Sequence, residues 1–191
     1  MRWLQRSCTS LVFRLGFDWP LSPLFAILPR MTNDSFLAGL ALFLGIGFIT
    51  GLRSMTGPAV IAWAVKLGWL HPMGALAFVG RTWAVALFTL LAIGELIADK
   101  LPGTPNRTGA VGLSGRILAA AFCGAVLAAS IPQNLWWGMA ICAITAVIGA
   151  FAGFRVRRYL TKVRGLPDFP VAIAEDVFTI VVGVLTAKRG F

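Results

Sequence analysis

The chain has 191 residues, of which 58% are hydrophobic and only 13% are charged. Soluble domains carry about 25% charged residues, so a soluble globular enzyme is excluded, as are a disordered chain, a collagen and a coiled coil. Lysine and arginine outnumber the acidic residues 17 to 7, for a formal net charge of +10. These values predict an all-α, polytopic membrane protein whose basic excess reports topology and contact with anionic phospholipids of the bilayer, rather than nucleic acid.

Residues 1–30 are predicted to form a separate N-terminal extension. Their apolar run is interrupted by Arg2, Arg6, Arg14 and three prolines, so it is too broken for a spanning helix. No small-residue cleavage site follows a clean apolar core, as a signal peptide would require. We expect an extension that lies on the membrane surface, or a translation start placed too far upstream. A single transmembrane domain then covers residues 31–191.

Four apolar stretches have the character of a spanning helix, which needs about 20 residues. They are residues 36–52, 83–98, 117–131 and 135–154. The stretch 117–131 reaches full length only if residues 109–116 join it.

Two further stretches are ambiguous. Residues 55–70 contain Gly57-Pro58 and Lys66, and residues 169–187 contain Glu175 and Asp176. The sequence therefore predicts a transmembrane helical bundle of five or six membrane segments, with helices broken by glycine or proline.

The basic residues predict the orientation of the bundle. Cytoplasmic loops are enriched in lysine and arginine. The densest basic run, predicted to be cytoplasmic, is Arg155, Arg157, Arg158, Lys162 and Arg164. Five tryptophans then gather on the outer side, as an aromatic belt would: Trp63, Trp69, Trp83, Trp136 and Trp137. Both six spans with an outer N-terminus and five spans with a re-entrant segment 55–70 satisfy this pattern.

Two stretches share a Gly-xxx-Gly-x-Arg pattern that suggests an internal repeat. One runs from Gly47 to Arg53 and the other from Gly149 to Arg155, and a proline-led apolar run follows each. Repeated helix pairs with one interrupted member are typical of transporters. The same GxxxG faces let helices approach closely, within one chain or in a homo-oligomer.

Ionisable residues within apolar segments are the candidate functional residues, because each costs about 2.5–3.5 kcal/mol at the bilayer centre. Glu95 and Asp99 are four residues apart, so they share one helix face. The full set of candidate binding or coupling residues is Glu95, Asp99, Glu175, Asp176, Arg53 and Arg155. They predict a polar cavity in which carboxylates bind a cation or proton. The alternative is a set of helix-end charges that reach the head groups.

Other chemistry is sparse in the sequence. His71 is the only histidine, and the three cysteines have no metal-site spacing, so we expect no metal centre. No glycine-rich nucleotide loop is present, so we expect no cofactor, and an enzyme is the less favoured class. Ser114 and Arg116, in a glycine-containing helix start, are a weak candidate site for a lipid phosphate.

Three segments carry a family resemblance: Gly51-Leu-Arg-Ser-Met-Thr-Gly-Pro58, Gly94-Glu-Leu-Ile-Ala-Asp-Lys-Leu-Pro102 and Phe169-Pro-Val-Ala-Ile-Ala-Glu-Asp176. From residue 31 to 191, the chain resembles a group of small bacterial inner-membrane proteins known only as a domain of unknown function. The resemblance implies a multi-pass location in the bacterial inner membrane. It implies no activity, ligand or catalytic residue.

Three functions fit these observations. The first is a small transporter or channel for an ion or small solute, which uses the membrane-embedded carboxylates. The second is a protein that binds or flips an anionic lipid or a lipid phosphate, in which the arginines are the working groups. The third is a structural accessory subunit without a site of its own.

Overall fold

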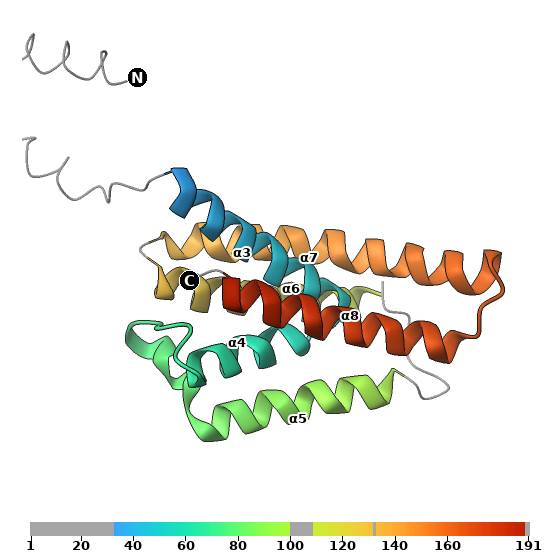
Figure 1. Cartoon of the computed structure of the whole chain (residues 1–191), viewed down its shortest axis with the longest axis horizontal. Coiled ribbons are helices and arrows are strands. Elements are labelled where there is room, and N and C mark those ends of the chain that lie inside the picture. The colour runs from blue at the N-terminus through green and yellow to red at the C-terminus, as the bar shows by residue number, and fades with distance from the viewer. Residues whose placement is uncertain (1–32, 100–108, 132, 190–191) are drawn as a thin grey trace, which may run out of the picture. The chain divides into compact units, whose positions relative to one another are not determined.

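The computed structural model describes residues 33–99, 109–131 and 133–189, and all the secondary structure in these ranges is helical (Figure 1). The elements are α3 (Asn33–Leu52), α4 (Thr56–Lys66), the 3₁₀ helix η1 (Gly74–Gly80), α5 (Thr82–Ala98), α6 (Ala110–Ser130), α7 (Leu135–Arg158), the π-helical turn η2 (Tyr159–Val163) and α8 (Asp168–Arg189). The predicted all-α fold is confirmed. The predicted N-terminal extension, residues 1–30, lies outside the described residues.

Three of the described helices are long and apolar enough to cross a membrane. They are residues 111–130 in α6, residues 135–163 in α7 with η2, and residues 168–188 in α8. A fourth span is formed if η1 and α5, which are bent by 65° relative to one another, count as one. These helices mark a membrane protein. The count of five or six membrane segments stays a prediction.

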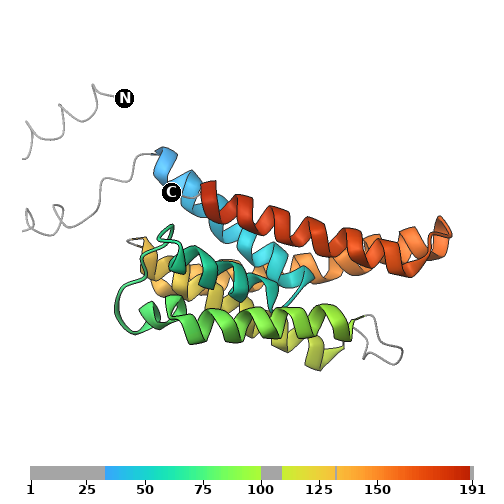
Figure 2. The ribbon, with the colours of Figure 1, turned by 60° about the horizontal axis from the view of Figure 1, so that its bottom comes forward.

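Successive α-helices of this bundle run in opposite directions (Figures 1 and 2). One end of the bundle therefore collects the α3–α4 turn, the end of α5, the start of α6 and the turn between α7 and α8. Five of the chain's seven acidic residues belong to this end: Glu95, Asp99, Asp168, Glu175 and Asp176. We call it the charged end.

The two GxxxG segments pack against each other in the contact between α3 and α7. A Cβ atom added at Gly51 would collide with the backbone of Ala146, and one added at Gly149 would collide with the backbone of Phe48. Such contacts bring two helix backbones together without side chains between them. The predicted close packing of the glycine faces thus occurs within the chain. A homo-oligomer and a true internal repeat stay predictions.

Helix α4 is short and lies inside the bundle. Of its 11 residues, eight are buried, from Thr56 to Ala62 and at Ala64. It contacts α3, α5, α6, α8 and η1. Eleven residues extend about 16 Å, roughly half of the 30 Å apolar core of a bilayer. Pro58 is accommodated because it lies in the first helical turn, where its missing N–H is not needed.

Candidate functional site

Arg53 lies directly after α3, where the chain turns back into α4, and it has 0% exposure. Its guanidinium group forms ion pairs with Asp99, at the end of α5, and with Asp176, in α8. The two carboxylate side chains are also nearly buried, at 10% and 9% exposure. Charges removed from water need such partners, because an unpaired buried charge is strongly destabilising. We call these three residues the Arg53 cluster.

One cation faces two anions in the Arg53 cluster, and each comes from a different part of the bundle. Arg53 belongs to the α3–α4 turn, Asp99 to α5 and Asp176 to α8. The side-chain charges of the three residues sum to −1 when both carboxylates are ionised. The cluster therefore ties both α5 and α8 to the α3–α4 turn through buried ion pairs.

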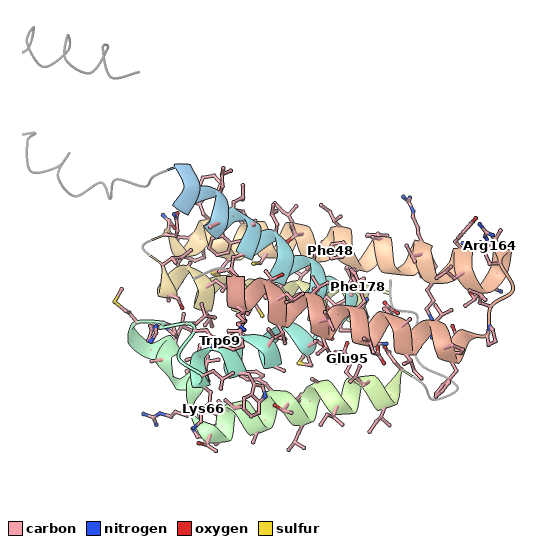
Figure 3. All side chains as sticks on the ribbon, viewed as in Figure 1. Phe48, Lys66, Trp69, Glu95, Arg164 and Phe178 are labelled. Atoms are coloured by element: carbon pink, nitrogen blue, oxygen red, sulfur yellow. The ribbon has the colours of Figure 1, made fainter. Side chains whose placement is uncertain are left out.

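Glu95 binds the start of α4 from the neighbouring helix α5 (Figure 3). Its carboxylate accepts hydrogen bonds from the Ser54 N–H at 2.8 Å, the Ser54 hydroxyl at 2.7 Å and the Met55 N–H at 2.8 Å. Met55, at the N-cap position, has no side-chain capping bond of its own. The first amides of a helix lack internal partners and carry partial positive charge, so a carboxylate stabilises them. Glu95 is therefore the helix cap of α4.

Glu175 and Asp176 are adjacent in sequence but serve different contacts. Asp176 binds Arg53, whereas the Glu175 carboxylate lies 3.8 Å from the Arg157 guanidinium. Arg157 also donates two hydrogen bonds to Asp168, at 2.8 and 2.6 Å. This second group joins the end of α7 to the start of α8. Gly165, with a φ of 67°, lies in the turn between them, and glycine adopts this backbone conformation readily.

One of the six candidate binding or coupling residues, Arg155, lies apart from the site. Arg155 is exposed on α7 and forms no ion pair among the residues that the structure describes. Arg157, two positions later, makes the contacts with acidic side chains that were expected of Arg155. Neither Arg157 nor Asp168 was among the candidate residues predicted from the sequence. The two residues flank a short turn, 11 positions apart, and this opposite-charge spacing was the signal that could have found them.

The proposed lipid-phosphate residues do not converge in the structure. Ser114 is exposed and donates a hydrogen bond to the Val111 carbonyl at 2.9 Å, whereas Arg116 is 5% exposed and faces inward. Residues two positions apart on a helix do not share a face. In the described residues, no group of three or more His, Cys, Asp or Glu side chains is arranged to hold a metal ion.

Fold and site together define the class: a helical membrane protein with a buried ion-pair network at the tight turn between α3 and the short helix α4. Residues 40–188 match the family model described as Domain of unknown function (DUF4126). The chain belongs to this family, since the match covers most of its length. No curated protein matches the chain, and no solved structure does. Family membership thus brings no activity with it.

Proposed function

We propose that this protein is a small transporter or channel of the bacterial inner membrane, which moves an ion or small solute and uses the Arg53 cluster as its coupling site. The observation that carries the proposal is the fully buried guanidinium of Arg53 between the carboxylates of Asp99 and Asp176. Ionisable groups within a membrane protein are costly and, in most cases, mark ion or substrate pathways.

The short helix α4, which is too short to cross a membrane and begins inside the bundle, supports this proposal. Discontinuous helices whose ends lie inside the membrane are a recurrent feature of transporters, where the helix termini contact charged groups. Here the start of α4 carries such a contact, because Glu95 accepts hydrogen bonds from the amides of Ser54 and Met55. Arg53 immediately precedes these two residues, so the cap and the Arg53 cluster share one turn.

The coupling we propose follows from the charge of the cluster. With both aspartates ionised, Arg53 holds α5 and α8 against the α3–α4 turn. Protonation of one aspartate, or cation binding to it, removes one of these two ion pairs and frees α5 or α8 to shift. The charged end faces the cytoplasm in this proposal, because the basic run from Arg155 to Arg164 lies there and cytoplasmic regions are enriched in such residues.

The test is an ion flux measurement on the full chain in phospholipid vesicles. Vesicles that contain a pH-sensitive dye are given a potassium gradient with valinomycin, and inward proton movement is recorded; a sodium gradient is tested in parallel. We expect a flux of protons, of sodium ions or of both that exceeds the flux in protein-free vesicles. Asp99→Asn should abolish the flux, because it removes the titratable group without changing its size.

Asp168→Asn is the matched control, because it makes the same chemical change at an acidic residue whose side chain is 62% exposed and outside the Arg53 cluster. It should leave the flux unchanged. The proposed use of the Arg53 cluster as a cation-coupling site is wrong if the wild-type protein gives no flux of protons or sodium ions, or if Asp99→Asn conducts as well as Asp168→Asn.

A further inference from the structure

An apolar groove lies between α7 and α8 at the charged end, and it has a volume of about 650 Å³. Phe48 and Leu52 at the end of α3 line it, together with Val156 and Leu160 on the α7 side and Pro170 and Phe178 on α8. Figure 3 labels Phe48 and Phe178 among these residues. We call it the α7–α8 groove. It exists because α7 and α8 make few direct contacts with each other, while α3 packs against both.

The groove exposes apolar side chains that no other described element covers. Val156 is 57% exposed and Phe178 is 52% exposed. In a bilayer this surface is in contact with lipid, so hydrocarbon and not water is its natural occupant. An α-helix about 10 Å across would fill 650 Å³ within one to two turns, so the volume fits a small ligand and not a helix of a partner protein.

The charges beside the groove decide which lipid it suits. Leu160 and Leu166 line one end of the groove, and between them in sequence are Lys162 and Arg164, both exposed. The segment from Arg155 to Asp168 contains five basic residues and one acidic residue, Asp168 itself. Arg157 contacts both Asp168 and Glu175, so these three groups sum to −1, whereas the other four basic residues of the segment sum to +4: Arg155, Arg158, Lys162 and Arg164. The surplus charge at this end of the groove is positive.

We propose that the α7–α8 groove binds one anionic phospholipid, with an acyl chain against Phe48, Val156 and Phe178 and the phosphate beside Arg158, Lys162 and Arg164. Basic clusters next to membrane helices on the cytoplasmic side recognise anionic head groups in this way. The site is separate from the Arg53 cluster and does not depend on ion coupling. The two sites meet in α8, where Glu175 lines the groove and Asp176 binds Arg53.

Native mass spectrometry of the purified full chain tests the proposal. The protein is titrated with phosphatidylglycerol and, separately, with phosphatidylcholine that has identical acyl chains. We expect one phosphatidylglycerol molecule to bind in preference to phosphatidylcholine. Inorganic phosphate, titrated with thermal stability as the readout, should not raise the unfolding temperature as phosphatidylglycerol does, because it lacks the acyl chain.

Two variants separate the chain site from the head-group site. Ala174→Phe fills the groove from α8 and should abolish the bound lipid, whereas Ala140→Phe makes the same change on the exposed face of α7 outside the groove and should not. The triple change Arg158→Ala, Lys162→Ala and Arg164→Ala should reduce the preference for phosphatidylglycerol by up to about a hundredfold, since each basic residue near an anionic surface adds about a factor of five. Lys66→Ala with Arg81→Ala, at the opposite end of the bundle, should have no effect.

Unfolding temperatures measured without added lipid establish that each variant is folded. The proposal is overturned if both lipids bind equally well, if Ala174→Phe retains the lipid that Ala140→Phe retains, or if inorganic phosphate stabilises the protein as much as phosphatidylglycerol does. Loss of lipid in the Lys66→Ala and Arg81→Ala variant would also overturn it, because the charge effect would then be non-specific.

Discussion

Helices α3 and α7 each contain two glycines four residues apart, followed by an arginine two positions later: Arg53 after α3 and Arg155 in α7. The two arginines differ in whether they are buried. Helix α3 ends at Leu52 and the chain reverses over three residues, so Arg53 turns into the bundle and is fully buried. Helix α7 continues through η2 to Val163, so Arg155 remains on an exposed helix surface. Whether the arginine is buried is therefore decided by where the helix ends and the chain reverses, and not by the glycine motif that precedes it.

The two glycine segments are also the two sides of one interface. Gly51 meets Ala146 on α7, and Gly149 meets Phe48 on α3. A shared need for close helix approach is therefore sufficient to explain why the two segments look alike.

Removal of the two arginines should give the largest difference. Arg53→Met leaves Asp99 and Asp176 buried without their cation, and breaking a buried ion pair in this way costs about 3–5 kcal/mol. Arg155→Met changes an exposed residue and should alter stability by no more than about 0.5 kcal/mol. Thermal unfolding in detergent measures both. Equal unfolding temperatures for the two variants would contradict the burial of Arg53.

Alanine at the interface glycines should have the next largest effect. Gly51→Ala and Gly149→Ala each place a methyl group against the backbone of the facing helix, and overpacking of this kind costs about 1–3 kcal/mol. The two losses should be similar, because one interface contains both residues. Gly94→Ala is the control, since nothing lies within 4 Å of its added Cβ and alanine favours a helix by up to about 1 kcal/mol.

If Gly51→Ala and Gly149→Ala unfold at the temperature of the wild-type protein, the two segments do not pack against each other as described. If both variants are destabilised and Gly94→Ala is also destabilised, the effect does not belong to the interface.

Much of the fold could be predicted from the sequence because apolar runs of spanning length have few alternatives to a helix. The stretches 36–52, 83–98 and 135–154 correspond closely to α3, α5 and α7. The stretch 117–131 needed the preceding residues, and α6 does begin at Ala110. The nature of residues 55–70 could not be predicted, because a buried 11-residue helix depends on the five elements that surround α4.

The candidate site was partly predictable for a similar reason. Charges in apolar segments are costly, so Arg53, Asp99 and Asp176 were candidates before their contact was known. The sequence could not distinguish Arg155 from Arg157, because that choice depends on which face of α7 is turned toward α8. Glu95 lies 41 positions after Ser54 and 40 positions after Met55, so no local sequence pattern encodes their contact.

Loss of the Glu95 carboxylate should destabilise the α3–α4 turn moderately. Glu95→Gln retains one acceptor oxygen but places an amide group where the second oxygen accepts a hydrogen bond from Met55, and loss of a helix cap costs about 0.5–2 kcal/mol. Thermal unfolding should show a decrease smaller than that of Arg53→Met. A variant as stable as the wild-type protein would mean that Glu95 does not cap α4.

The corresponding contact at the start of α8 should contribute least. Asp168, whose side chain is 62% exposed at the start of α8, binds Arg157 in the last turn of α7, and ion pairs that water reaches contribute about 0–1 kcal/mol. Asp168→Asn should therefore change the unfolding temperature less than Glu95→Gln does, and the change should shrink further at high salt because the pair is screened. A larger decrease in unfolding temperature for Asp168→Asn than for Glu95→Gln would mean that the contact at the α7–α8 turn, and not the one at the α3–α4 turn, contributes more to stability.

The central claim is that the buried charges after α3 couple ion movement and do not only hold the helices together. The most direct test measures unfolding temperature and ion flux on the same preparation of Asp176→Asn, which leaves Arg53 its contact with Asp99. We predict a folded protein with a modestly lower unfolding temperature whose flux falls to that of protein-free vesicles. A folded Asp176→Asn protein that retains the wild-type flux would contradict the claim and assign the Arg53 cluster to structure alone.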